Sequence, residues 1–446
     1  MNEQMMFRAG AGKGEIIYPQ DMFPFRDGPD LWTGIHDIPC VRAVLLDCGL
    51  RVLLISLEVV LLDREMESRI KTIAAELTGI PQDQILLMVT HTVSTPHFFV
   101  KEHNSEKENA LALRMRANIL EAAKAAVEQA NETIQDASIG FGCGTCRANV
   151  NRVIQTADGW WLGSGEEWPA DHSVPVVRID GKDQKTIAIL YNYHCELAVM
   201  DKSVMSDGGR HVTADLAGAA SRFIEHEYDD QVVALFLPGV STDQGPAYKA
   251  VRTVRGRNGS YRSVDIKEAG WILLELEGER LGEQVLVAAE QASCAALTHP
   301  IRLENQTFWF RGQKLRGLPN PMKGPVLEWP FLPDADRTRS VEAMVLGNTI
   351  FLSVGGIGIE TAEKIKQNSP FENTIILADL NGAAPRLPTD GRKYMAEEHL
   401  YQKVSFQARN SEFAAGSAEK MLEDVLKFLQ DIKENNVSST KGTDLP

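Results

Sequence analysis

Residues 84–96 read QILLMVTHTVSTP, a short apolar run that ends abruptly in polar residues. The apolar part, Ile85–Val89, is too short for a typical helix and rich in Ile, Leu and Val, which favours a strand buried on both faces. His91 lies just beyond it, at the strand end where open α/β sheets hold their ligands. A lone histidine at such a position can equally be a structural residue that hydrogen-bonds beneath a loop.

Three further segments have the same pattern, namely residues 186–194 (TIAILYNYH), 231–243 (QVVALFLPGVSTD) and 349–360 (TIFLSVGGIGIE). The first ends in His194, the second in a turn that contains Asp243, and the third in glycines followed by Glu360. Two imidazoles and a carboxylate, each from a separate strand end, match the ligand set of a zinc site that leaves one coordination position open. The four segments together are therefore a stronger signal than any one of them.

Strand-like runs alternate with amphipathic stretches at helical spacing, which lie at residues 63–77, 110–130, 214–228, 265–293 and 413–433. This alternation predicts an α/β fold, with layered mixed sheets and flanking helices. The Pro-rich residues 315–336 are read as an ordered surface loop, because Glu360 lies beyond them and both histidines before them. We therefore expect one domain over residues 1–434 and a disordered polar tail over residues 435–446.

Composition excludes several classes of partner. The net charge of −15 argues against nucleic acid and against an anionic membrane surface. No apolar run reaches the ~18 residues that span a bilayer, and the N-terminus does not resemble a secretory signal. Six scattered cysteines fit a reducing compartment, so we expect a cytoplasmic protein. The expected partner is a small-molecule substrate, and a homo-oligomer is compatible with this composition.

Seven segments resemble, in the same order, the amidase domain of the neutral/alkaline ceramidase family. They are residues 9–16 (AGAGKGEI), 34–46 (GIHDIPCVRAVLL), 89–96 (VTHTVSTP), 148–153 (ANVNRV), 191–199 (YNYHCELAV), 212–221 (VTADLAGAAS) and 358–366 (GIETAEKIK). The resemblance runs over most of the chain. It implies the fold of that domain and hydrolysis of an acyl bond at a zinc ion.

Carried over position by position, the resemblance implies a zinc ion, or another divalent metal, with ligands His91, His194 and Glu360. Three positions depart from the family pattern. Val93 stands where the THTHSGP signature has its second histidine, and Gly245 stands where the family has its serine. The family's tyrosine ligand falls near Arg386. These replacements argue against the ceramide reaction itself and leave metal-assisted hydrolysis in place.

Chemistry and sequence neighbours indicate further candidates. A general base is expected among Asp243, His211 and His97, the last because it follows Val93 closely enough to fold back. Substrate-binding candidates are His36, which matches a family histidine, together with Arg152, Arg210 and Arg386, since arginine recognises carboxylates and phosphates bidentately. Each of these arginines can equally be a structural ion-pair partner.

The sequence therefore predicts a metal-dependent hydrolase that acts on an amide, ester or lactone bond of a soluble small molecule through a metal-activated water. A sugar-derived acid is one option for the substrate. Two alternatives stay open. One is a metal-assisted isomerase or lyase on a sugar-like substrate, and the other is a non-catalytic, ligand-binding descendant of the same family.

Overall fold

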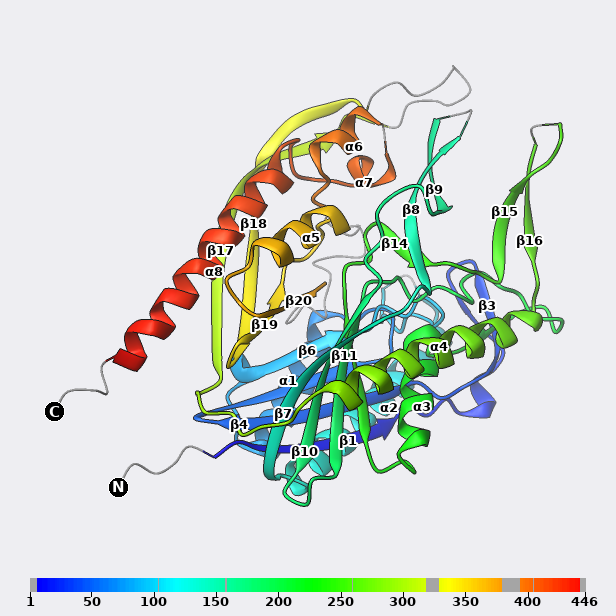
Figure 1. The fold of residues 1–446 in the computed structure, drawn as a ribbon. Coiled ribbons are helices and arrows are strands. Elements are labelled where there is room, and N and C mark those ends of the chain that lie inside the picture. Colours follow the sequence, from blue (N-terminus) through cyan, green and yellow to red (C-terminus); the bar gives the residue numbers. More distant parts are fainter. Residues whose placement is uncertain are drawn as a thin grey trace.

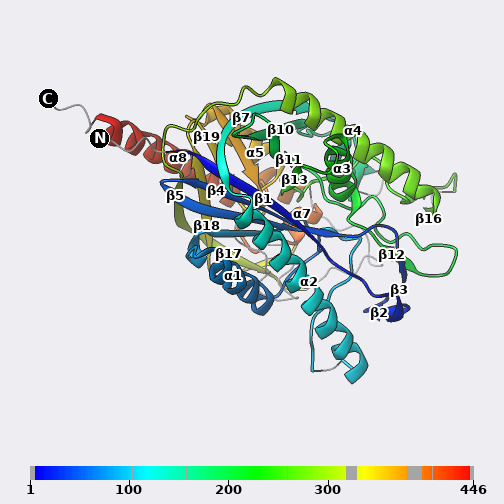
Figure 2. The same cartoon turned by 90° about the horizontal axis from the view of Figure 1, so that it is seen from below.

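The computed structural model describes residues 6–102, 104–156, 159–258, 260–317, 329–378, 394–403 and 405–441. Its largest element is an eight-stranded mixed sheet with the strand order β13-β11-β10-β7-β1-β4-β5-β6. Only two residue pairs join β1 to β7, so the sheet bends there into two halves. The halves face each other, and helices cover their outer faces (Figures 1 and 2).

The first half of the sheet carries two helices. Its strands are β1 (Arg8–Glu15), β4 (Cys40–Cys48), β5 (Leu50–Leu57) and β6 (Ile85–Val89), and its helices are α1 (Arg64–Thr78) and α2 (Glu106–Glu132). Helix α2 approaches β1 closely because β1 has glycine at alternate positions. A Cβ atom on Gly10, Gly12 or Gly14 would lie about 2.1–2.2 Å from a backbone oxygen of α2. The alternate glycines thus set the distance between helix and sheet.

The second half repeats this arrangement with other elements. Its strands are β7 (Gln135–Thr145), β10 (Ser173–Gly181), β11 (Thr186–Tyr193) and β13 (Val233–Pro238), and its helices are α3 (Asp215–Glu227) and α4 (Ala269–Gln291). Apolar residues of both halves, including Leu54 and Leu190, meet in one buried core between them. The result is a layered sandwich of helices, two sheet halves and helices.

A four-stranded sheet packs against this sandwich. It contains β17 (Arg302–Leu315), β18 (Phe331–Leu346), β19 (Thr349–Ser353) and β20 (Asn373–Leu377), and it is covered by α5 (Ile359–Asn368) and α8 (Ser417–Lys441). Met344 and Phe351 of this sheet belong to the core between the two halves. The Asn192 side chain joins the sheets directly, because its Nδ2 donates to the backbone oxygens of Leu237 at 2.8 Å and Ile376 at 3.3 Å.

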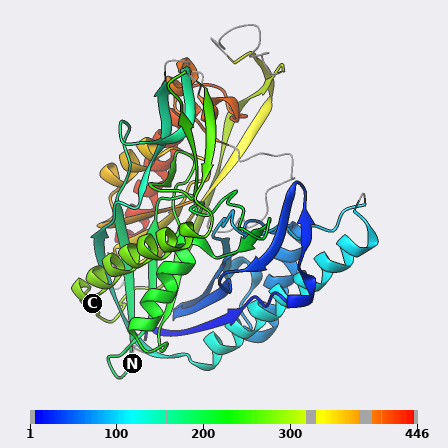
Figure 3. The ribbon, with the colours of Figure 1, turned by 90° about the vertical axis from the view of Figure 1, so that its right-hand side faces the viewer.

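Short elements surround the strand ends. They are η1 (Gln20–Met22), β2 (Phe25–Asp27), β3 (Asp30–Ile35), η2 (Gln82–Gln84), β8 (Asn149–Thr156), β9 (Gly159–Gly165), β12 (Arg210–Val212), β14 (Gln244–Pro246), β15 (Val251–Arg255), β16 (Tyr261–Asp265), α6 (Glu398–Gln402) and α7 (Phe406–Arg409). Two of the hairpins, β8–β9 and β15–β16, project from the body of the molecule (Figures 1 and 3).

The predicted fold class is confirmed, and most expected helices lie within a few residues of their predicted bounds. Two helices begin four residues later than predicted. Helix α4 starts at Ala269, because Asp265 ends strand β16, and α8 starts at Ser417. Strands β17 and β18 extend into the Pro-rich stretch from both sides, and residues 318–328, where the loop was predicted, lie outside the described residues. Helix α8 runs to Lys441, past the point where the disordered tail was expected to begin. None of the helices in the described ranges is both long and apolar enough to cross a membrane.

Candidate functional site

The ends of β6 and β11 lie at the same rim of the molecule, although these strands belong to different halves of the sheet. The amide of Val93, beyond β6, donates to the Leu197 carbonyl, beyond β11, at 3.2 Å. Asp215 fastens the two loops together from the start of α3. Its carboxylate accepts hydrogen bonds from the Ser94 hydroxyl at 2.6 Å and the Val199 amide at 2.9 Å. The loops beyond β6 and β11 are therefore in direct contact.

His194 is fully buried at the end of β11, and its hydrogen bonds fix its tautomer. The Val240 amide donates to Nδ1 at 2.8 Å, so the proton of the neutral ring sits on Nε2. The nearest carboxylate oxygen, Oδ2 of Asp171, lies 3.4 Å from Nε2. That distance is long for a hydrogen bond, and the contact is mainly electrostatic.

Asp171 links His194 to helix α5. Lys366 on α5 donates to Asp171 Oδ2 at 2.6 Å, and the Ser173 amide donates to Oδ1 at 2.8 Å. Burial favours the neutral acid, but attraction to His194 and Lys366 outweighs it and holds the pKa of Asp171 well below its usual range. Burial also lowers the pKa of His194, against the opposing pull of Asp171. Asp171 is therefore ionised beside Lys366, and burial works against the charged form of His194.

Two of the three predicted metal ligands, His194 and Glu360, are not arranged around a common metal position. A metal at Nε2 of His194 needs a lone pair there, but the Val240 amide forces the proton onto that atom. Glu360 points elsewhere, to Lys364 Nζ at 2.8 Å and to His399 Nε2 at 3.1 Å. The hydrogen bond from Lys364 lowers the pKa of Glu360. Within the described ranges, no three His, Cys, Asp or Glu side chains form a group that could hold a metal.

Two buried carboxyl groups meet at the N-terminus of α5, between the two sheets. Both oxygens of Asp243 lie 3.1 Å from the amide of Ile359, the first residue of the helix. Glu397 accepts a hydrogen bond from the Thr361 hydroxyl at 2.9 Å, and its oxygens lie within 2.7 Å of the point where a Cβ on Gly358 would sit. Glycine at position 358 therefore leaves the space that brings Glu397 close to the helix end.

Burial raises the pKa of both carboxyl groups. The pKa of Asp243 rises to about 6, mainly because the group is desolvated. The pKa of Glu397 rises to about 7 through desolvation and through the nearby negative charge of Asp243. Near neutral pH one group of the pair can thus be ionised while the other keeps its proton, which is the condition for paired acid and base catalysis.

These pKa values predict how stability depends on pH. Both lie above the unfolded-state values near 4, so the folded chain binds more protons than the unfolded chain between about pH 4 and pH 7. The free energy of unfolding should therefore fall as pH rises through this window. The Glu397→Gln variant keeps the contact with Thr361. It should show a smaller difference in the free energy of unfolding between pH 5 and pH 8, measured by urea denaturation. Glu398→Gln, at an exposed neighbouring position, is the control; equal slopes in both variants would contradict the assignment.

Two predicted substrate-binding arginines are engaged in contacts within the fold. Arg152 pairs with Glu196 at 2.9 Å, and its backbone amide donates to the Asp243 carbonyl at 2.7 Å. Arg210 pairs with Asp30 at 2.7 Å and donates to the Val93 carbonyl at 3.0 Å. Both arginines thus position the loops that follow β13 and β6. Arg386 lies in residues 379–393, outside the described residues.

The remaining histidine candidates lie on the surrounding elements. His97 Nδ1 lies 2.9 Å from the carboxylate of Asp27 on β2. His36 stacks on Trp271 of α4, with ring centroids 3.9 Å apart, and the His211 ring is 6.3 Å from the same indole. The structure therefore brings His36 and His211 together around Trp271, and places His97 with the β2–β3 hairpin.

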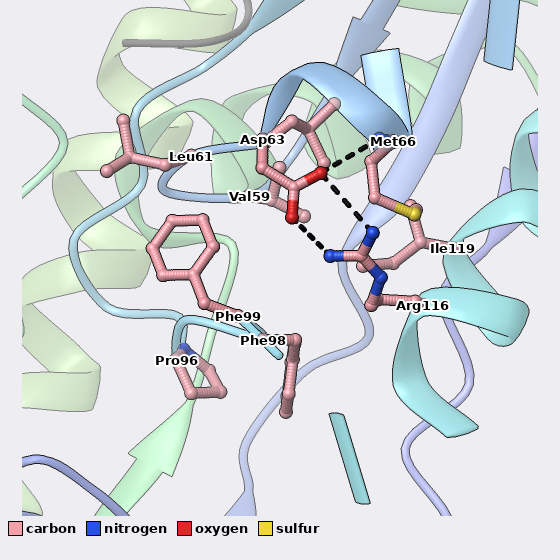
Figure 4. Close-up of a pocket in the computed structure, with 10 residues that line it drawn as sticks. Val59, Leu61, Asp63, Met66, Pro96, Phe98, Phe99, Arg116 and Ile119 are labelled. Carbon is pink, nitrogen blue, oxygen red and sulfur yellow. Dashed lines mark hydrogen bonds and ion pairs between the residues drawn. The ribbon is translucent and has the colours of Figure 1, made fainter. Parts of the chain in front are cut away.

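Two hollows in the described part of the chain are lined by neither the carboxyl pair nor the pair of His194 and Asp171. The first, between α1, α2 and residues 96–99, is about 10 Å³, enough for roughly one water molecule (Figure 4). Asp63 closes it by accepting from the Met66 amide at 2.9 Å and pairing with Arg116. The second, of about 400 Å³, is lined by residues that include Phe141, Leu297 and Thr349. Thr349 begins β19, whereas Glu360 and Asp243 meet the other end of that strand.

Solved structures of two ceramidases have a similar architecture. The neutral ceramidase from Pseudomonas aeruginosa superimposes with a TM-score of 0.69 at 14% sequence identity, covering 97% of this chain and 75% of that one. The chain has a ceramidase-like fold. A ceramidase complexed with C2 matches equally, with a TM-score of 0.69, 14% identity and coverage of 97% and 76%. No protein-family model and no curated protein matches the sequence.

Sequence reasoning missed Glu397, Asp171 and Lys366. Glu397 comes soon after residues 379–393 and does not end an apolar run. Asp171 lies in the loop before β10. Lys366 is a helix residue whose charge gives no indication of its partner. Lys366 and Glu397 reach the rim because the four-stranded sheet packs against the sandwich, so no local pattern could have identified them.

Proposed function

We propose that the chain is a hydrolase that cleaves an amide, ester or lactone bond of a soluble small molecule. The observation that carries this proposal is the pair of buried carboxyl groups, Asp243 and Glu397, at the N-terminus of α5. The pair lies at the rim where the ends of β11 and β13 meet the four-stranded sheet. A ceramidase-like fold over 97% of the chain supports the same reading.

The chemistry follows from the protonation of the pair. Ionised Asp243 takes a proton from water as the water oxygen bonds to the acyl carbon, and protonated Glu397 gives its proton to the leaving nitrogen or oxygen as the acyl bond breaks. The N-terminus of α5 adds a partial positive charge close to the developing oxyanion. These groups supply a base, an acid and electrostatic stabilisation without further residues.

A zinc ion, or another divalent metal, on His91, His194 and Glu360 stays a prediction from the family resemblance. A bound metal would polarise the acyl oxygen and lower the pKa of a water. The described donors do not adopt such a geometry, so no step of the proposed reaction passes through a metal. An isomerase or lyase, and a protein that binds its ligand without turnover, are the alternatives that the experiment must separate from hydrolysis.

The test is a panel of N-acyl amides, esters and lactones assayed across pH, with and without added zinc. We expect turnover of at least one class, with a pH profile whose limbs lie near 6 and 7. Glu397→Gln should lower kcat by about 10²-fold and remove one limb, since loss of a general acid costs roughly that much. Metal content of the wild type and of His91→Ala is measured on the same preparations. Binding of panel compounds without hydrolysis under any condition would contradict the proposal.

A further inference from the structure

The hairpin formed by β15 and β16 differs in charge from the rest of the molecule. Residues 249–263 (KAVRTVRGRNGSYRS), which we call the basic hairpin, contain five Lys and Arg and no Asp or Glu. The whole chain carries −15, so removing the +5 of the basic hairpin leaves −20 on the remainder. A positively charged segment on a negatively charged body attracts anions.

The strand register places two arginines on one face of the basic hairpin. Arg252 lies opposite Val264, and Arg262 lies opposite Val254. Directly opposed residues share a face, and so do alternate residues along a strand, so Arg252 and Arg262 are diagonal neighbours on that face. Both are exposed, as is Arg257 near the turn. In the described part of the chain, no carboxylate forms an ion pair with any of these three arginines.

The base of the basic hairpin is fastened to the loop that leads away from His194. Asp265 accepts hydrogen bonds from the Ser203 hydroxyl at 2.7 Å and the Val204 amide at 2.8 Å. The Ala250 amide donates to the Val199 carbonyl at 2.8 Å. The segment from Asp243 to the start of β15 is short, and the hairpin projects beside β8–β9 (Figures 1 and 3). The base of the basic hairpin therefore adjoins the loop that follows β11, the strand that ends just before His194.

We infer that the basic hairpin is an anion-binding surface that recognises a carboxylate, phosphate or sulfate on the substrate, away from its scissile acyl bond; this rests on the proposed function. Arginine binds each of these groups bidentately, and two guanidiniums on one face offer two such contacts. An acidic body repels anions, so an anionic substrate needs a cationic surface near the site to approach it. The one acidic residue of β16, Asp265, is held at the base by Ser203 and Val204, so the exposed arginines stay available to an external ligand.

The binding test uses labelled dextran sulfate, with neutral dextran as the uncharged probe, and measures fluorescence anisotropy at low and high salt. We expect the wild type to bind dextran sulfate but not neutral dextran, and to release dextran sulfate at high salt. Arg252→Ser with Arg262→Ser should raise Kd at least tenfold. Arg64→Ser with Arg69→Ser, two exposed positions on α1, changes the net charge equally and should leave Kd unchanged. Equal binding by the two double variants, or none by the wild type, would overturn the inference.

Activity provides the second readout. For an acyl substrate that carries an anionic group, the hairpin double variant should raise KM about tenfold at unchanged kcat, whereas KM for a neutral analogue should not move. An equal change for both substrates would also overturn the inference. The Asp243→Asn variant should still bind dextran sulfate, so a failure of the proposed hydrolysis and a failure of the anion-binding surface give different results.

Discussion

Arg42→Met should lower the free energy of unfolding by about 3–5 kcal/mol, the usual cost of removing one partner from a buried ion pair. Arg42 lies on β4 with its side chain 3% exposed. Its Nη1 donates to Glu58 at 2.5 Å, and its Nε donates to Glu225 at 2.7 Å. Lys13 contacts the same Glu225 carboxylate at 2.9 Å. The network thus contains two cations and two anions, and the substitution leaves it one cation short.

The loss of stability should include contacts beyond the ion pair, because the two carboxylates also accept hydrogen bonds from backbone amides. Glu58 accepts from the Cys40 amide at 2.6 Å, and Glu225 accepts from the Ala234 amide at 3.1 Å. These contacts connect both halves of the bent sheet to α3. Without Arg42 the pair of acids faces like-charge repulsion in a site from which water is excluded.

Urea denaturation at neutral pH measures the effect of Arg42→Met, and Arg69→Met is the matched control. Arg69 is about half exposed and lies 3.7 Å from Glu65, so its replacement should cost less than about 1 kcal/mol. Adding Glu58→Gln to Arg42→Met removes the one uncompensated charge and should restore part of the lost stability. If Arg42→Met cost no more than Arg69→Met, the buried network would not stabilise the fold as proposed.

The sequence predicted those parts of the fold that follow from local patterns. Ile85–Val89 and residues 186–194 are apolar runs whose composition alone favours a buried strand, and both form buried strands that end at one rim. The resemblance to the ceramidases added the global arrangement, which solved structures confirm for the fold. Periodicity could not show that the sheet bends between β1 and β7, because that bend depends on short pairing between distant segments.

The candidate site was harder to predict because its contacts are long-range. His194 has the expected place at a strand end, but its tautomer is set by the Val240 amide, 46 residues further along the chain. Glu360 lies at the start of α5, as expected for a residue after β19, yet helical geometry aims it at Lys364 one turn away. Residue type and strand-end position thus identified where side chains lie, and backbone donors and helix phase decided where they point.

Asp243→Asn should lower kcat for the acyl substrate by about 10²–10⁴-fold, which is the range expected for loss of a general base. The asparagine oxygen can still accept from the Ile359 amide, so the cap on α5 and the fold should survive. Removing the negative charge also removes a cause of the raised pKa of Glu397. The residual activity should therefore have its remaining pH limb shifted below 7, a change that a merely structural role would not produce.

The control for Asp243→Asn is Asp180→Asn, which alters another buried aspartate in the same way. Asp180 lies near the far end of β10, where it accepts from Arg178 at 2.8 Å and from Thr186 at 2.9 Å. The Asp180→Asn variant should lose some stability, while its kcat and the pH profile of kcat stay as in the wild type. If Asp243→Asn kept kcat within about threefold of the wild type, Asp243 would be a helix cap alone. The acid–base assignment would then have to move to other groups of the rim, with the Asp171–His194 pair as the next candidate.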